Sequence, residues 1–225
     1  MKLLRATTFF TLLIVSAQAA DSDQSLAAWF KAQGNIQTWS ADFIQTRILK
    51  TFTQPLTATG HVWFAAPSRF RWEIGNPPST IAVHQGDEMT VIYPRLKRAE
   101  HYSLSSAQAG PWKDMLSLLE AGFPRSQAEV ESRFRILSQT LSNGVVQLSL
   151  QPKSAAARRM MPLVQIAFGR NDLSLRSTEM QFADGSRMRN DFTNQVLNPK
   201  LDEHFFTPKL GTDYKIVEPL KGAQK

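Results

Sequence analysis

Cysteine is absent from the 225 residues of the chain. The absence excludes disulfide bonds and thiol catalysis, so the folded protein must be held together by packing of its core. It also excludes a lipid-modified cysteine as a membrane anchor. We therefore expect the processed protein to be soluble and mobile.

Long hydrophobic runs are also missing. The one marked apolar stretch, Thr7–Val15, is too short to span a bilayer. It follows the cationic Lys2 and Arg5 and precedes the small-x-small sequence Ala17–Ala19. This arrangement is typical of a secretory signal peptide, which we predict over residues 1–19 and expect to be cleaved.

Signatures of catalysis and of metal binding are missing as well. There is no HExxH motif, no GxSxG nucleophile elbow and no glycine-rich phosphate loop. None of the four histidines, His61, His84, His101 and His204, pairs with another at metal-ligand spacing. A carboxylate pair could in principle form among Asp42, Glu73, Asp184 and Asp191, but solvated strand faces and turns are the expected places for them. A Ser/His/Asp site assembled from distant residues stays open, because such sites are defined by geometry. We predict no enzymatic activity, no cofactor and no metal.

Negative charge is in the minority, since 26 Lys and Arg face 19 Asp and Glu for a net charge of +7. The basic residues are scattered along the chain, and export places the protein away from the genome, so nucleic acid is not an expected partner. Attraction to an anionic membrane surface or to an acidic partner fits the charge better.

Period-two alternation of apolar and polar residues dominates the rest of the chain. In Arg69–Ile74, Phe70, Trp72 and Ile74 alternate with charged residues, as expected for a strand with one buried face. Asn143-Gly144 is a strong hairpin turn. About eleven strands are predicted: Trp39–Leu49, Leu56–Phe64, Arg69–Ile74, Ile81–His84, Met89–Tyr93, Arg98–Leu104, Arg133–Leu141, Val145–Pro152, Leu163–Phe168, Leu173–Phe182 and Arg187–Leu197.

Helical patterns are few and short. Ser22–Ala32 is amphipathic, and Gly34 is expected to end it in a left-handed turn. Pro111–Ala121 has an apolar stripe behind an N-terminal proline, and Ser126–Glu131 predicts one more turn. The fold class is therefore mainly β with an α lid. We expect a single antiparallel curved sheet, or incomplete β-barrel, covered by short helices.

Large apolar residues are predicted to line the concave face of this sheet and the underside of the lid. They suit a cavity for acyl chains if the lid packs loosely, and equally a core filled by the helices alone. The candidate lipid-binding residues are Phe43, Phe64, Phe70, Trp72, Met89 and Val91 on strands, and Trp29, Phe30, Trp112, Met115 and Leu119 on helices.

Four segments resemble the LolA-like outer-membrane lipoprotein carriers. Ala41–Thr46 is similar to the opening strand of that family, and Gly60–Phe64 with Pro67–Glu73 is similar to its most specific block. Gln85–Pro94 resembles a family hairpin, and Phe205–Asp213 resembles the family tail. The resemblance runs from about residue 24 to residue 217, within a LolA-like domain predicted over residues 20–225.

The resemblance implies an unclosed barrel with a helical lid over an apolar cavity. It implies a periplasmic monomer that takes lipoproteins from an inner-membrane ABC exporter to an outer-membrane acceptor. Phe70 and Trp72 would line the cavity mouth, Pro67 would shape the adjoining turn, and Pro67 with Phe70 would meet partners. The cargo is expected to be lipoproteins or other acylated lipids.

One position departs from the family pattern. The arginine that ties lid to barrel, just before Pro67, is replaced by Ala66. Arg69 and Arg71 are near, but strand alternation points both away from Phe70. An accessory or sensor module for another lipid exporter or for an envelope-stress pathway is therefore the alternative reading.

Overall fold

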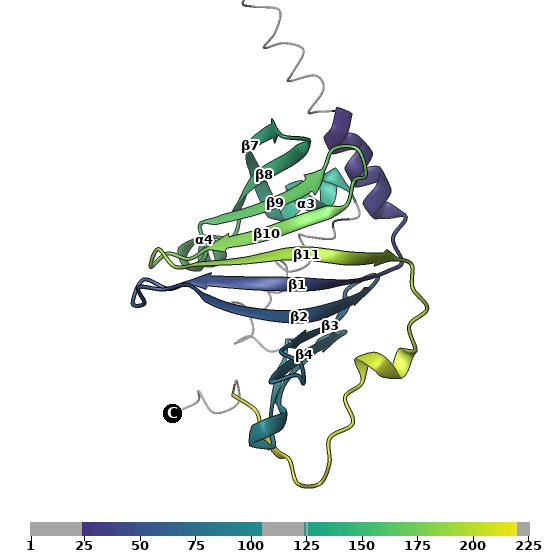
Figure 1. Cartoon of the computed structure of the whole chain (residues 1–225), viewed down its shortest axis with the longest axis vertical. Coiled ribbons are helices and arrows are strands. Elements are labelled where there is room, and N and C mark those ends of the chain that lie inside the picture. Colours follow the sequence, from purple (N-terminus) through teal and green to yellow (C-terminus); the bar gives the residue numbers. More distant parts are fainter. Residues whose placement is uncertain (1–23, 105–123, 125, 220–225) are drawn as a thin grey trace, which may run out of the picture.

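A computed structural model describes residues 24–104, 124 and 126–219, and it shows one open sheet of twelve strands (Figure 1). The spatial order is β12-β6-β5-β4-β3-β2-β1-β11-β10-β9-β8-β7, so β12 and β7 are edges and the barrel does not close. The strands are β1 (Thr38–Ile48), β2 (Leu56–Ala65), β3 (Arg69–Ile74), β4 (Thr80–Gln85), β5 (Glu88–Tyr93), β6 (Arg98–Ser103), β7 (Phe134–Ser142), β8 (Val145–Pro152), β9 (Leu163–Gly169), β10 (Leu175–Gln181), β11 (Arg187–Leu197) and β12 (Lys215–Val217).

The predicted fold class is confirmed, with one strand added. Eleven strands pair antiparallel with their neighbours, as the alternation indicated. The Asn143-Gly144 turn has positive φ at both residues (50° and 73°), as a tight hairpin turn requires. The added strand, β12, pairs parallel with β6, and its three residues are too few to show alternation.

Helices are few in the described residues. An N-terminal helix covers residues 24–34, followed by α3 (Gln127–Arg133), α4 (Ala155–Met160) and the short 3-10 helices η1 (Pro94–Leu96) and η3 (Glu203–Phe206). None of them is long and apolar enough to cross a membrane.

Two of the sequence-based helix predictions can be compared with the structure in detail. Ser126 caps α3, since its Oγ accepts a hydrogen bond from the Glu129 amide at 3.1 Å. The prediction for Gly34 is wrong: it is still helical, and the chain leaves the helix through backbone bonds from Asn35 to Ala32 and from Ile36 to Gln33. The predicted signal peptide and the predicted helix Pro111–Ala121 lie outside the described residues.

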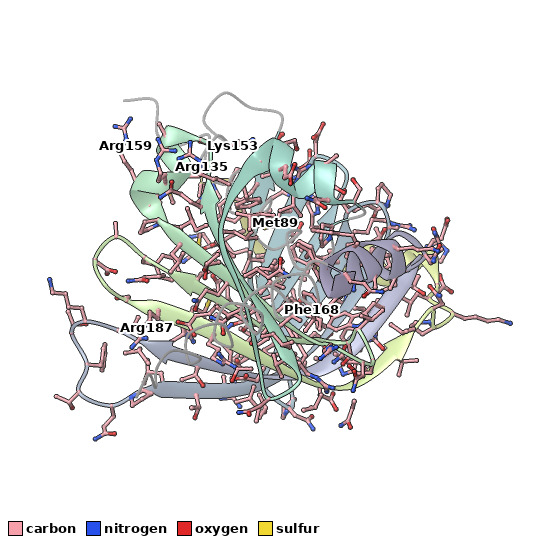
Figure 2. The ribbon with its side chains drawn as sticks, turned by 90° about the horizontal axis from the view of Figure 1, so that it is seen from above. Met89, Arg135, Lys153, Arg159, Phe168 and Arg187 are labelled. Atoms are coloured by element: carbon pink, nitrogen blue, oxygen red, sulfur yellow. The ribbon has the colours of Figure 1, made fainter. Side chains whose placement is uncertain are left out.

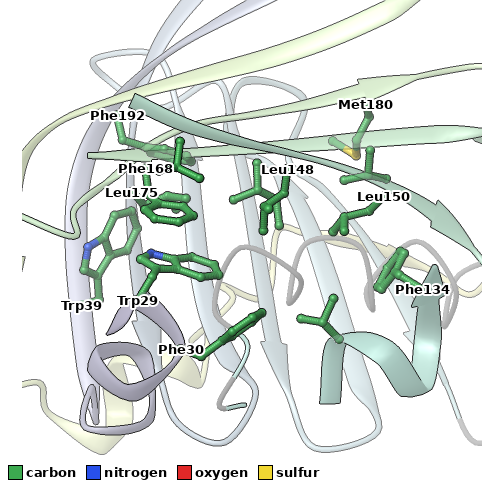
Figure 3. Close-up of a cluster of buried hydrophobic side chains, with 14 of the residues drawn as sticks. Trp29, Phe30, Trp39, Phe134, Leu148, Leu150, Phe168, Leu175, Met180 and Phe192 are labelled. Atoms are coloured by element: carbon green, nitrogen blue, oxygen red, sulfur yellow. The ribbon is translucent and has the colours of Figure 1, made fainter. Parts of the chain in front are cut away.

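The sheet curves around an interior in which Met89 and Phe168 lie (Figure 2). Its main buried cluster, here the Trp29 core, joins the N-terminal helix and α3 to strands β1, β2 and β7–β11. Trp29 is fully buried and stacks on Phe168, with ring centroids 4.6 Å apart and planes 8° from parallel. Figure 3 shows the aromatic and aliphatic side chains that interlock there.

The C-terminal segment covers the opposite, convex face. Phe206 of η3 is buried against Ala65 and Val83, and the chain then reaches β12 at the sheet edge. The concave face of β3–β6 is therefore distinct from the surface that η3 covers.

Candidate lipid-binding face

The strand register brings the predicted apolar residues of neighbouring strands onto one face. Phe64 lies opposite Phe70, which lies opposite His84 on the next strand, and His84 lies opposite Met89. A second row runs beside it, because Trp72 is opposite Ala82 and Ala82 is opposite Val91. Residues directly opposite one another point to the same side, so both rows form one continuous surface.

A second buried cluster sits on this surface. It consists of Phe70, Met89, Tyr102 and Leu104, with Trp72, Ala82 and Val91 packed against it. We call these seven residues the Phe70 cluster. Every member comes from β3–β6 or from the residue that follows β6. Among the described residues, no helix contributes a side chain to it, in contrast to the Trp29 core.

Tyr102, Leu104 and Ala82 were not among the predicted site residues. The alternation in Arg98–Leu104 is interrupted by Glu100, which shares the face with Tyr102, so the apolar side of β6 was hidden. The available signal for an apolar face was that Tyr102 and Leu104, two positions apart, point to the same side of the strand.

Gly60 is a further residue that the sequence reasoning did not single out. A Cβ at this position would lie 2.3 Å from Cζ of Phe43 and 2.1 Å from the carbonyl oxygen of Glu73. The bare backbone therefore leaves room for the Phe43 ring, which contacts Trp72 at a centroid distance of 4.4 Å. Phe43 and Trp72 link the Trp29 core to the Phe70 cluster.

Polar groups on this face find partners within the protein. Nδ1 of the buried His84 donates to the carbonyl oxygen of Ser68 at 2.5 Å, which ties β4 to the β2–β3 turn. Glu100 accepts from Arg98 and from the Tyr102 hydroxyl, each at 2.7 Å. Burial, followed by the bond to Glu100, raises the pKa of Tyr102 well above its usual range. The hydroxyl therefore stays protonated and remains a hydrogen-bond donor to Glu100.

Trp29 and Phe30, predicted as lid residues, are in the Trp29 core rather than in the Phe70 cluster. Their rings lie 5.3 Å apart, between the N-terminal helix and the β8–β9 side of the sheet. Of the other helical candidates, Trp112, Met115 and Leu119 lie outside the described residues.

The two arginines near Ala66 point away from the apolar face, as the alternation predicted. Arg69 lies over the Phe206 ring at 5.3 Å, and Arg71 lies over the Phe205 ring at 5.0 Å. Arg71 also donates to Glu73 at 2.7 Å. Both cations hold the C-terminal segment on the convex face. Ala66, half-buried against the Trp29 core, precedes Pro67 in the β2–β3 turn.

A pocket of about 550 Å³ lies on the convex side of β1–β3, with polar and apolar side chains in its lining. In it, His61 Nδ1 and Asp42 are 2.6 Å apart, and Asn194 donates to Asp42 at 2.8 Å. Hydrogen bonds from Asn194 and then from His61 lower the pKa of the Asp42 carboxyl. Within the described part of the chain, Asp42 is the one hydrogen-bond partner of the His61 ring that the structure shows. The same residues contain no group of three His, Asp or Glu placed to hold a metal ion.

The chain was compared with models of known protein families. The model of the family described as "Outer membrane lipoprotein carrier protein LolA" matches residues 34–209, which include β1–β11. The chain belongs to the LolA family. The match covers both the Trp29 core strands and the Phe70 cluster.

Two relatives are named outer-membrane lipoprotein carrier proteins. The chain is 26% identical to the one from Dechloromonas aromatica over 214 residues, which cover 94% of this chain and 95% of the relative. It is 27% identical to the one from Chromohalobacter salexigens over 196 residues, which cover 87% and 85%. Among solved structures, a LolA superfamily protein from Nitrosomonas europaea is similar, with a TM-score of 0.42, 11% identity and coverage of 81% and 97%.

Proposed function

We propose that this LolA-family chain is a periplasmic carrier that binds the acyl chains of lipoproteins, or of a related lipid, and moves them from the inner to the outer membrane. The Phe70 cluster is the proposed contact surface for the acyl chains. Family membership and the names of the two carrier relatives support this assignment.

The observation that carries the proposal is the continuous apolar surface of the Phe70 cluster, whose described members all come from β3–β6 and the residue after β6. Phe70, Met89, Tyr102 and Leu104 are 3–7% exposed, so an acyl chain would reach them by displacing the contacts that bury them. Burying an acyl chain contributes about 0.8 kcal/mol per CH₂ group, so even a partly covered chain supplies a large driving force.

A carrier must also release its cargo. Release becomes possible when the protein's own apolar side chains re-pack in place of the acyl chains, because this competition lowers the net affinity. Met89 suits such a surface, since the flexible thioether side chain adapts to different neighbours. In this proposal the chain does no chemistry on the cargo, and no cofactor takes part.

Binding of an acyl probe by delipidated protein tests the proposal. An apolar fluorescent probe is expected to bind, and a triacylated peptide is expected to displace it. Phe70→Glu places a charge in the cluster and is expected to weaken probe binding at least about tenfold. Ile44→Glu is the matched control, because Ile44 is exposed on the convex side of β1 and should leave binding unchanged.

Absence of probe binding in the unmodified protein, together with normal lipoprotein sorting in cells that carry Phe70→Glu, would contradict the carrier proposal. Co-purification separates the carrier from the regulatory alternative. If the protein co-purifies with a membrane exporter and acylated cargo, it is a carrier. If it co-purifies with an envelope regulator and without lipid, it is a sensor module.

A further inference from the structure

Three segments meet at one end of the sheet. The β1–β2 hairpin and the β10–β11 turn are neighbours there, because Ile48 lies opposite Arg187, and the Lys50 amide donates to Ser186 Oγ at 3.3 Å. The turn is joined to α4 by a bond from the Ala183 amide to the Met160 carbonyl oxygen at 3.0 Å. We call the surface formed by residues 47–56, 182–187 and 153–160 the basic end.

Positive charge is concentrated on this surface. Its exposed cations are Arg47, Lys50, Lys153, Arg158, Arg159 and Arg187, and Asp184 is the one carboxylate in the three segments. In the part of the chain that the structure describes, Arg47 and Arg159 have no ion-pair partner, and Arg187 reaches Glu179 only at 4.0 Å. Figure 2 shows Arg159, Lys153 and Arg135 at one corner, with Arg187 on the same side of the molecule.

Apolar side chains project from the same surface. Phe52, between the two strands of the hairpin, is 57% exposed, and Ile48 and Met160 are 40% and 43% exposed. The hairpin extends beyond the neighbouring strands in Figure 1. An exposed aromatic side chain on a surface rich in cations resembles the amphipathic surfaces that bind membranes, in which apolar groups enter the headgroup region and cations meet lipid phosphates.

A bilayer fits this shape better than a folded protein does. Phe52 is 57% exposed in the β1–β2 hairpin, so a protein partner would need an acidic surface with a matching apolar pocket, whereas a fluid lipid surface adapts to an exposed ring. We propose that the basic end binds the anionic surface of a lipid bilayer, with Phe52 inserted between headgroups and the surrounding arginines and lysines on their phosphates. This proposal concerns a surface separate from the Phe70 cluster and does not depend on acyl carriage.

Sedimentation with vesicles tests the proposal on the purified protein. Vesicles of phosphatidylcholine with phosphatidylglycerol are expected to bind the protein at low salt, and pure phosphatidylcholine vesicles are expected not to. Because a cation near an anionic membrane contributes about fivefold in affinity, Lys50→Glu with Arg159→Glu should lower binding at least about 20-fold. Phe52→Asn should lower it about fivefold and leave the salt dependence intact.

Matched variants separate this surface from general attraction by a basic protein. Lys31→Glu with Lys200→Glu makes the same change in net charge at exposed positions away from the basic end and should alter binding less than about threefold. Leu197→Asn, at the other end of β11, is the control for Phe52→Asn. Thermal melts confirm that each variant is folded.

Equal losses in the two double variants would overturn the proposal, because they would show adsorption by net charge alone. Wild-type binding by Phe52→Asn would overturn the insertion of Phe52. Failure to bind anionic vesicles at low salt, with retention on an immobilised acidic polypeptide, would assign the basic end to an acidic protein instead.

Discussion

The Trp29 core and the Phe70 cluster occupy two regions of one concave face, and they differ in the elements that supply their described side chains. The Trp29 core is completed by the N-terminal helix and α3, and its largest rings stack in close contact. The Phe70 cluster has the same kinds of side chain, but its described members all come from β3–β6 and the residue after β6. In the proposed function, the Trp29 core stabilises the fold and the Phe70 cluster exchanges its contacts for those of the cargo.

The largest effect is expected in the Trp29 core. Trp29→Ala removes a fully buried ring and leaves a cavity beside Phe168, so it should lower the free energy of unfolding by about 3–5 kcal/mol. Urea denaturation measures the change. Trp63→Ala removes a half-buried ring from the convex face and should cost clearly less. Equal costs would break the assignment of Trp29 to the stabilising region.

Gly60 tests the junction between the two regions. Gly60→Ala introduces a Cβ that collides with Phe43 and with the Glu73 carbonyl, so we expect a loss of about 1–3 kcal/mol of stability. Gly86→Ala, at a turn position where a Cβ meets nothing within 4 Å but where φ is positive, measures the backbone cost alone. Thermal melts that rank the two variants in the reverse order would contradict the packing of Phe43 over Gly60.

Trp72 separates stability from binding. Trp72→Ala removes a half-buried ring, so its cost to stability should be about 1–2 kcal/mol, less than that of Trp29→Ala. The Trp72→Ala variant should nevertheless lose more affinity for an acyl probe than a convex-face variant of equal stability does. Fluorescence titration and urea denaturation of the same samples give the two numbers. Parallel losses in both would mean that the two regions do not differ in role.

The smallest effect is expected at Asp42, on the convex side of β1. Its pKa is lowered in the folded state, so its contribution to stability is present above the ordinary carboxyl pKa of 3.8 and is lost as the pH falls through the lowered value. Because the carboxylate is about half exposed, the contribution should stay below about 1 kcal/mol. Acid denaturation of Asp42→Asn against wild type measures it, and a stability difference that persists unchanged below the lowered pKa would contradict this account.

Local patterns in the sequence predict much of this fold. Alternation located eleven strands within a few residues, because each has one buried and one wet face. Alternation missed β12, whose position depends on pairing with β6. It also missed Tyr102, because the charged Glu100 on the same face interrupts the apolar pattern of β6. Gly34 remained helical because the tertiary structure, and not the local preference of glycine, decides where that helix ends.

The division of the concave face could not be predicted from the sequence. Trp29 and Phe30 have the spacing of a helix that buries one side, but spacing does not specify which strands that side covers. Their docking against Phe168 is a tertiary contact between residues far apart in the chain. The predicted lipid-binding set therefore combined residues of two regions.

Photo-crosslinking of a bound acyl chain tests the central claim most directly. A lipopeptide with a photoreactive group in its acyl chain is bound to the protein, irradiated, and the labelled residues are identified by mass spectrometry. Labels on Phe70, Trp72, Met89 or Val91 are predicted. Labels confined to β8 and β9, around Leu148 and Phe168, would contradict the account, because they would place the cargo in the region assigned to stability.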